Sequence, residues 1–93
     1  MAIVIWTDET IADLMGHVAY IDQFNPMAGD RMASRLLAAG NSLITFPKRG
    51  KAQPNGCREL AVVHPYVLVY DVPGEDVRIL RVWHGAQDRT PSS

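Results

Sequence analysis

Three apolar runs rich in β-branched and aromatic residues follow one another closely in the second half of the chain, and they restrict its fold more than any other feature. They are Cys57–Val63, Tyr66–Val72 and Asp76–His84, each typical of a β-strand in length and composition. His64-Pro65 separates the first two runs, and Pro73-Gly74 supplies a turn between the others. Connections this short join antiparallel neighbours, because a parallel pair needs a crossover of about a dozen residues or more. The pattern therefore predicts a three-stranded antiparallel meander.

The first half of the chain predicts one short strand and two helices. Ala2–Trp6 is an apolar, β-branched run, and Thr7 follows it as a candidate N-cap for a helix that closes near Phe24. Asn25-Pro26 signals the start of a second helix, which we expect to continue until Pro47 stops it. Each helix has an apolar stripe at spacings of three and four residues, and His17, which falls between stripe positions, is expected to be exposed. The stripes are Ile11, Leu14, Met15, Val18 and Ile21, and then Met32, Leu36, Ala39, Leu43 and Phe46.

These elements predict a single α+β domain over residues 1–93 in the order β-α-α-β-β-β, with a helical hairpin packed on one face of a mostly antiparallel, curled sheet. Residues 47–56 are polar and rich in turn formers and are expected to form a loop, and the tail 86–93 is expected to be frayed. The last strand has apolar residues on both sides, which predicts a central strand. Strict alternation would place Arg78, Leu80, Val82 and His84 on one side, and Val77, Ile79, Arg81 and Trp83 on the other.

Charge and cysteine content exclude several classes of protein. The net charge is −1, which disfavours a domain that binds nucleic acid mainly through charge. Cys57 is the only cysteine, so an intramolecular disulfide is excluded. No segment approaches the roughly 20 apolar residues of a membrane helix, which favours a cytoplasmic location. The sequence contains neither the ligand spacing of a metal site nor a phosphate-binding glycine loop, so we expect no cofactor and no metal.

Four stretches, taken in order, resemble the ParE/RelE superfamily of toxins: IVIWTDETIADL, SLITFPKRG, GCRELAV with its neighbour HPYVLVYDV, and DVRILRVWHGAQDR. The last stretch resembles ParE-type chains most, because Arg81 lies inside an apolar strand that runs into His84 and, shortly after, Asp88. The resemblance implies the β-α-α-β-β-β fold and a toxin of a type II toxin–antitoxin system. It also implies a hetero-oligomer with a cognate antitoxin, ParD-like or other, which holds the toxin inactive. The helix residues expected to bind the antitoxin are Leu14, Met15, Val18, Met32 and Leu36.

The superfamily divides by target, and the resemblance leaves three functions open. A RelE-like chain is a ribosome-dependent endonuclease that cuts messenger RNA, a ParE-like chain blocks DNA gyrase without catalysis, and an inactive homologue only binds its antitoxin. The ribosome-directed members tend to be strongly basic. Since this chain has net charge −1, the gyrase interpretation is favoured.

Different residues serve the two active functions. RNA cleavage by attack of a 2′-hydroxyl needs an acid–base group and cations, for which the resemblance points to His84, Arg58 and Arg81. Glu59 neighbours Arg58 in a strand and therefore faces the opposite side. Binding to gyrase would use the end of the chain, with candidates Trp83, His84, Gln87, Asp88 and Arg89. Lys48, Arg49 and Lys51 form either a phosphate-facing loop or an ordinary solvated turn.

Overall fold

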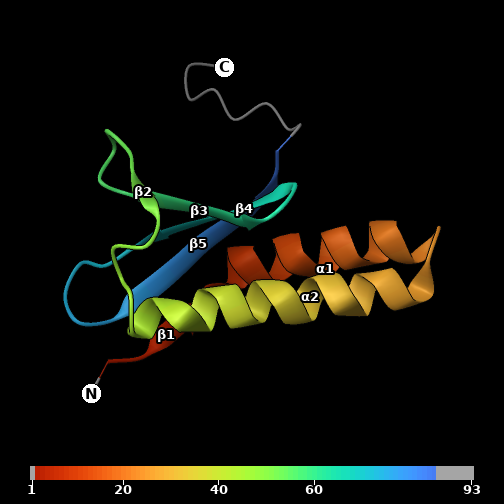
Figure 1. Ribbon diagram of the computed structural model, residues 1–93, viewed down its shortest axis with the longest axis horizontal. Helices are drawn as coiled ribbons and strands as arrows, with labels where there is room; N and C mark the ends of the chain where they lie inside the picture. The colour runs from red at the N-terminus through yellow and green to blue at the C-terminus, as the bar shows by residue number, and fades with distance from the viewer. Residues whose placement is uncertain (1, 86–93) are drawn as a thin grey trace.

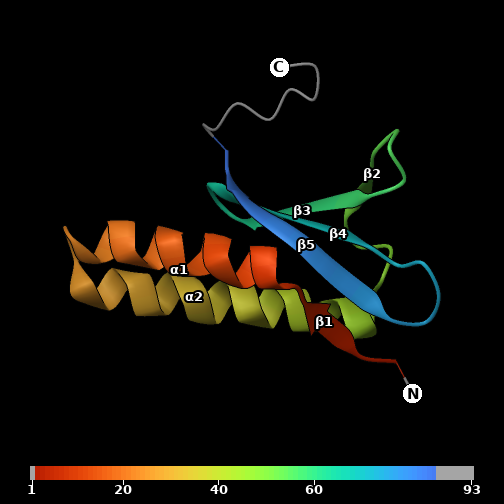
Figure 2. The same cartoon turned by 180° about the vertical axis from the view of Figure 1, so that it is seen from behind.

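The structure, a computed structural model, describes residues 2–85 and shows a helical hairpin lying along one face of a twisted sheet (Figures 1 and 2). The predicted order of elements is confirmed, with one short strand added inside the predicted loop. The elements are β1 (Val4–Trp6), α1 (Asp8–Asp22), α2 (Pro26–Asn41), the 3₁₀ turn η1 (Ser42–Ile44), β2 (Lys51–Ala52), β3 (Arg58–Val63), β4 (Tyr66–Asp71) and β5 (Val77–His84).

Within these residues the sheet has five strands in the order β1-β5-β4-β3-β2. The predicted meander of β3, β4 and β5 is antiparallel and is confirmed. The predicted central place of β5 is met only in part, because β4 is the middle strand and β5 lies between β4 and the short β1. β1 joins the other side of β5 in a parallel pairing, with Val4 opposite Val77 and Trp6 opposite Ile79. Figure 2 shows β1 alongside the start of β5. The first and last strands of the chain are therefore neighbours.

A β-bulge makes the strict alternation predicted for β5 wrong beyond its middle. Arg81 lies opposite Val69, but Ile79 lies opposite Tyr70, so Leu80 is an extra residue on β5. The bulge returns Val82 to the side of Ile79, and both are fully buried beneath the helices at 1% and 0% exposure. Arg81 and Trp83 consequently lie on the outer face of the sheet, away from the core.

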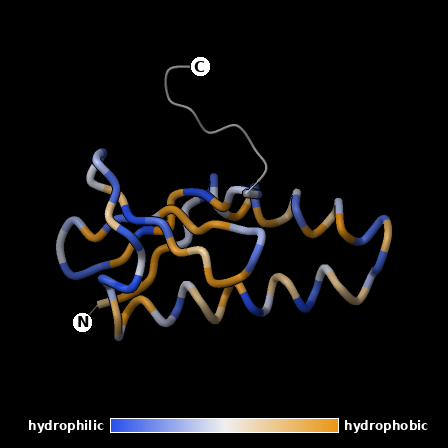
Figure 3. Tube along the Cα trace, turned by 45° about the horizontal axis from the view of Figure 1, so that its top comes forward, coloured by the Kyte–Doolittle hydropathy of each residue, from blue (hydrophilic) through white to orange (hydrophobic). Residues whose placement is uncertain are grey.

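The core lies between α2 and the facing side of the sheet. Leu36 and Leu43 come from the helical layer, and Leu68, Tyr70 and Ile79 come from the strands, all at 1% exposure or less. Each such side chain contributes about 1.5–3 kcal/mol relative to an exposed one. Figure 3 shows apolar residues along the strands of the sheet and mostly hydrophilic residues in the loop that contains β2.

The helix starts follow the predicted signals, whereas the end of α2 does not. The Thr7 hydroxyl accepts a hydrogen bond from the Thr10 backbone N–H at 3.3 Å, which confirms the N-cap. Pro26 occupies the first turn of α2, although the Asn25 side chain makes no capping bond. The helix ends at Asn41 rather than continuing toward Pro47. Beyond it the chain tightens into η1, where the Ser42 hydroxyl donates to the Ala39 carbonyl oxygen at 2.6 Å and competes with regular helical bonding.

Candidate functional site

One side of α1 closes the edge of β5 with side chains. β1 pairs only with Val77–Ile79, so the rest of that edge lacks a neighbouring strand among the residues described. The hydroxyls of Thr7 and Thr10 donate to the Ile79 carbonyl oxygen at 2.8 and 2.6 Å. Further along, the Asp13 carboxylate accepts from the Val82 N–H at 3.0 Å. These side chains replace the hydrogen bonds of a missing strand and protect the edge.

His17 continues this row, which corrects its predicted exposure. Its Nε2 lies 2.9 Å from the Val82 carbonyl oxygen, and the residue is half-buried. The four positions of the row are three, three and four residues apart, which places them on one face of the helix. The apolar stripe used for the sequence prediction does not include them, because their role depends on the strand that α1 meets.

The Arg81 guanidinium is held by this same row. Its Nε and Nη2 donate to the two carboxylate oxygens of Asp13 at 2.7 and 3.0 Å, and its Cζ lies 4.3 Å from the centre of the Trp83 ring. Burial acts to raise the pKa of Asp13, but hydrogen bonds from Arg81 and from the Val82 N–H outweigh it and hold the pKa below its ordinary value. The hydrogen bonds that Arg81 donates to Asp13 likewise raise the pKa of Arg81. Arg81 is therefore a paired, structural cation.

An aromatic cluster surrounds the end of β5. The Tyr66 and His84 rings meet edge to face with centres 5.4 Å apart, and the His17 ring lies 5.0 Å from Tyr66 on its other side. Burial, and then the nearby Tyr20, raise the pKa of the Tyr66 hydroxyl. Trp83 and His84 are both half-buried, so the end of β5 is partly accessible to solvent.

Arg58 lies at the opposite end of the sheet from His84. It pairs with Tyr70, whereas His84 pairs with Tyr66, and four strand residues span about 13 Å. The Arg58 Nη1 donates to the carbonyl oxygens of Gly50 at 2.8 Å and Lys48 at 3.4 Å, so its role here is to hold the loop.

The three predicted catalytic residues therefore do not converge. Arg81 is on the outer face of the sheet, Arg58 is on the helix face beside the loop, and His84 is at the far end of that face. The prediction of a ribonuclease site made of these residues is not supported by the geometry. Among residues 2–85 there is also no group of three or more potential metal-ligating side chains.

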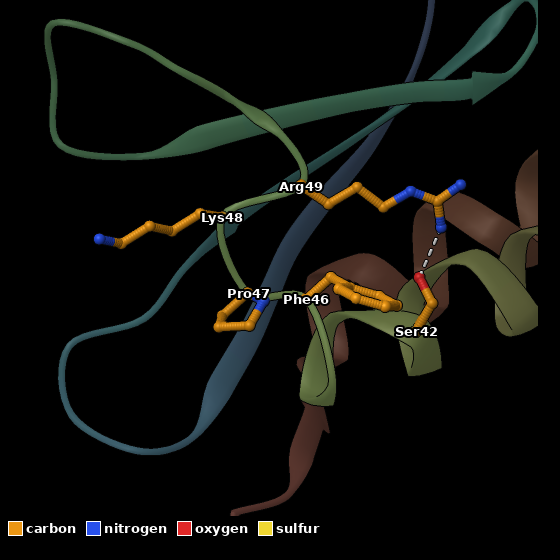
Figure 4. Close-up of a pocket in the computed structure, with 5 residues that line it drawn as sticks. All are labelled: Ser42, Phe46, Pro47, Lys48 and Arg49. Atoms are coloured by element: carbon orange, nitrogen blue, oxygen red, sulfur yellow. Dashed lines mark hydrogen bonds between the residues drawn. The ribbon is translucent and has the colours of Figure 1, made fainter.

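The predicted phosphate-facing loop also separates its cations. Figure 4 shows the Arg49 side chain extending over the end of the helix, where its Nη1 donates to the Ser42 hydroxyl at 2.7 Å, while Lys48 points the opposite way. Lys51 belongs to β2 and lies opposite Glu59. The loop instead forms one wall of a hollow of about 710 Å³ with Phe46 and Pro47 in its lining.

The predicted antitoxin-binding residues are mostly used by the fold itself. Leu36 and Met32 are buried at 1% and 8% exposure, so in the folded chain these two side chains belong to the core. Leu14 and Val18 are half-buried against the same core. Met15 alone of the five is well exposed, at 67%. The apolar stripes of both helices pack on the sheet. The tertiary structure decides which of their residues are buried.

Two further predictions concern the surroundings of the site. Gln87, Asp88 and Arg89 lie outside the described residues. In the part of the chain that is described, no helix has the length and apolar character needed to cross a membrane.

Comparison with known proteins identifies relatives along nearly the whole chain. Residues 4–89 match the family described as ParE toxin of type II toxin-antitoxin system, parDE. The chain is 46% identical to Toxin RelE2 of Caulobacter vibrioides, with 94% of this chain and 99% of the relative covered. It is 31% identical to Toxin RelE1 of the same organism, with 77% and 81% covered. The identity to the putative toxin Y4kP of Sinorhizobium fredii is 32%, with 88% and 86% covered.

A solved structure shares the fold. A chain of the structure titled "Chromosomal ParDE TA system from P. aeruginosa" superposes with a TM-score of 0.77 at 21% identity, over 90% of this chain and 95% of that chain. The predicted fold is thereby confirmed.

Proposed function

Because this chain belongs to the ParE toxin family of type II toxin–antitoxin systems, we propose that it arrests growth by inhibiting DNA gyrase. A cognate antitoxin neutralises it. The family establishes the toxin and implies the antitoxin, and the target is the proposed step. Gyrase acts on chromosomal DNA, so the proposal includes a cytoplasmic location.

We favour gyrase over messenger RNA as the target because the three candidate catalytic residues lie apart. Cleavage of RNA needs an acid–base group and a cation within reach of the same phosphate. Arg81 is paired with Asp13, and Arg58 is bonded to loop carbonyls on a different part of the sheet. A protein that inhibits by binding needs no such convergence. The net charge of −1 supports the same choice, since phosphate contacts dominate the affinity of RNA-binding domains.

The proposed target-binding surface is the end of β5, with Trp83 and His84 and the residues that follow them, Gln87, Asp88 and Arg89. Trp83 supports this because the residue is half-buried and the Arg81 Cζ lies 4.3 Å from the centre of its ring. A large aromatic side chain held in place by its neighbour is typical of a binding hot spot.

Purified chain and gyrase test the proposal in a DNA supercoiling assay. We expect inhibition by the wild-type chain and a loss of at least about tenfold in potency for Trp83→Ala, the size of a hot-spot truncation above about 1.4 kcal/mol. Met27→Ala is the matched control, because Met27 is an exposed apolar residue of α2, at 63% exposure. Normal supercoiling in the presence of excess wild-type chain contradicts the proposal.

Expression of the chain in cells separates the two remaining functions. Transcript cleavage that stops in His84→Ala, with antitoxin binding retained, identifies a ribosome-dependent endonuclease. Growth without arrest in the absence of the antitoxin identifies an inactive homologue that only binds its partner. Intact transcripts together with growth arrest are expected if gyrase is the target.

A further inference from the structure

The outer face of β5 carries Trp83 beside an arginine. Trp83 is two positions beyond Arg81 and follows the bulge, so both side chains lie on the outer face of the sheet. The Arg81 Cζ lies 4.3 Å from the centre of the Trp83 ring, which is within the range of a cation–π contact. In the neighbouring strand, Val67 lies opposite Trp83 and Val69 lies opposite Arg81. The ring therefore has a charged neighbour along its own strand and an apolar neighbour across it.

Arg81 is itself anchored to α1. Its Nε and Nη2 donate to the two carboxylate oxygens of Asp13 at 2.7 and 3.0 Å. Two parallel hydrogen bonds fix the plane of the guanidinium as well as its position. The Asp13 carboxylate is fixed in turn, because it also accepts from the Val82 N–H at 3.0 Å. Asp13, Arg81 and Trp83 consequently form a chain of contacts from α1 to the outer face of the sheet.

Other contacts hold the end of β5 independently of this chain. Val82 is fully buried beneath the helices at 1% exposure. On the helix face, the rings of Tyr66 and His84 meet edge to face with centres 5.4 Å apart, and these two residues are also paired in the strand register. Loss of the Arg81 contact is therefore expected to free the Trp83 side chain and to leave the strand in place.

The orientation of Trp83 matters for binding, because a side chain that is already ordered loses less entropy when it meets a partner. Immobilising one side chain on binding lowers the affinity by about three- to tenfold. Arginine suits the task of ordering the ring beforehand. Its planar guanidinium can stack on an aromatic ring while it grips a carboxylate with two bonds, whereas the ammonium of lysine is a point charge.

We propose that Asp13 and Arg81 are positioning residues, which hold the Trp83 indole in the orientation that binds the target. They act through Trp83 and need no contact with the target themselves. This inference rests on the proposed function, in which Trp83 is part of the surface that binds gyrase. It adds that a side chain of α1 sets the affinity of a surface at the end of the last strand.

Arg78 provides a matched control on the same strand and the same face. Its Nε and Nη2 donate to the Asp71 carboxylate at 2.9 and 2.7 Å, which is the same bidentate arrangement. Arg81→Lys and Arg78→Lys each keep the charge and remove one bidentate pair. The first pair lies beside the Trp83 ring, whereas the second lies at the other end of β5. A difference between the two variants therefore reports the contact with the ring.

Nuclear magnetic resonance of the free chain tests the positioning in the absence of gyrase. The measured quantity is the order parameter of the Trp83 indole N–H, with the Trp6 indole as internal reference. We expect a value above about 0.8 in the wild type and in Arg78→Lys, and below about 0.6 in Arg81→Lys, which are the ranges of rigid and flexible groups. Asp13→Asn is also expected to lower it, because a neutral amide holds the guanidinium less firmly than a carboxylate does.

The supercoiling assay tests the consequence for binding. Arg81→Lys is expected to lower the potency of inhibition about three- to tenfold, and Arg78→Lys less than twofold. In a Trp83→Ala background, Arg81→Lys is expected to add less than a twofold loss, because a positioning residue has no effect once the side chain that it positions is absent. Direct contact between Arg81 and gyrase would give the full loss in both backgrounds. All variants are assayed well below their melting temperatures, so unfolding does not contribute.

The two experiments separate this inference from the proposed function. Normal supercoiling with excess wild-type chain refutes gyrase as the target, and the order parameter then decides whether Asp13 and Arg81 position Trp83. An indole that is equally ordered in the wild type and in Arg81→Lys overturns the inference, whatever happens to gyrase. Equal losses of potency in Arg81→Lys and Arg78→Lys overturn it too, as does a full loss from Arg81→Lys in the Trp83→Ala background. Inhibition that Trp83→Ala leaves unchanged overturns both the proposed surface and the inference.

Discussion

Removal of the Asp13 carboxylate is the most direct test of how α1 and β5 are held together. In the wild type this carboxylate accepts three hydrogen bonds, two from the Arg81 guanidinium at 2.7 and 3.0 Å and one from the Val82 N–H at 3.0 Å. Asp13→Ala removes all three. It leaves the Val82 N–H without an acceptor on that side of β5 and leaves Arg81 without its counter-ion.

The expected loss of stability in Asp13→Ala follows from the number of these hydrogen bonds and the exposure of their partners. Hydrogen bonds to charged groups contribute about 1.5–3 kcal/mol each when both partners are sheltered. The Arg81 side chain is 40% exposed and that of Asp13 is 17% exposed, so solvent weakens the ion pair toward the surface value of about 1 kcal/mol or less. Adding the partly buried bond from the Val82 N–H, we expect Asp13→Ala to lower the free energy of unfolding by about 2–3 kcal/mol. Asp13→Asn keeps an acceptor for Val82 and is expected to lower it by about 1 kcal/mol.

Thermal and chemical denaturation measure the effect. For a domain of this size, 1 kcal/mol corresponds to about 4–8 °C, so Tm should fall by about 10–20 °C in Asp13→Ala. Asp30→Ala is the control, because Asp30 is an exposed acid on α2, and a surface change of this kind stays within about 0.5 kcal/mol. Amide hydrogen exchange then locates the change. Val82 should exchange faster by about tenfold for each 1.4 kcal/mol lost, while Leu68 in the adjoining strand should change only as far as global stability does.

Equal melting temperatures for Asp13→Ala and Asp30→Ala would refute this reasoning. So would a loss of stability without any faster exchange at Val82, because the carboxylate would then act somewhere other than the strand edge.

Three further predictions follow from the same structure. Gly40→Ala should lower the free energy of unfolding by about 1–2 kcal/mol, because a Cβ there would clash with the Trp6 ring. Gly16→Ala is the matched control, since a Cβ at Gly16 has nothing within 4 Å, and it should raise the free energy of unfolding by about 0.5–1 kcal/mol. The same denaturation experiment measures both variants. Tyr70→Phe should lower the free energy of unfolding by about 1–2 kcal/mol and speed hydrogen exchange at the Gly50 amide. The reason is that the Tyr70 hydroxyl donates to the Pro47 carbonyl oxygen and accepts from the Gly50 N–H, both at 2.8 Å. Because folding lowers the pKa of Asp13 from 3.8, its stabilising contribution should be complete above about pH 5 and decrease as the pH falls below 3.8, so the stability difference between wild type and Asp13→Asn should shrink in acid. A difference that is constant from pH 7 to 3 contradicts that assignment.

The sequence by itself determined the local elements and their order. Thr7 and Pro26 mark helix starts by chemistry that acts within one turn, and both occupy those positions in the structure. The connections at His64-Pro65 and Pro73-Gly74 are too short for a crossover, so consecutive strands must be antiparallel neighbours. The meander was therefore predictable from the sequence. The exception is the end of α2, where the Ser42 hydroxyl diverts the chain into η1.

Only the tertiary structure decided which side chains meet. Arg58, Arg81 and His84 look like one site along the sequence, but strand register places them apart, and a single extra residue at Leu80 moves Val82 to the opposite side from the one predicted. Asp13 and His17 gave no signal, because their partner is a backbone edge about 65–70 positions away. The physical reason is the distance along the chain over which each interaction acts. Capping, turns and periodicity depend on neighbours within a few residues, whereas pairing register and burial depend on how distant segments are brought together.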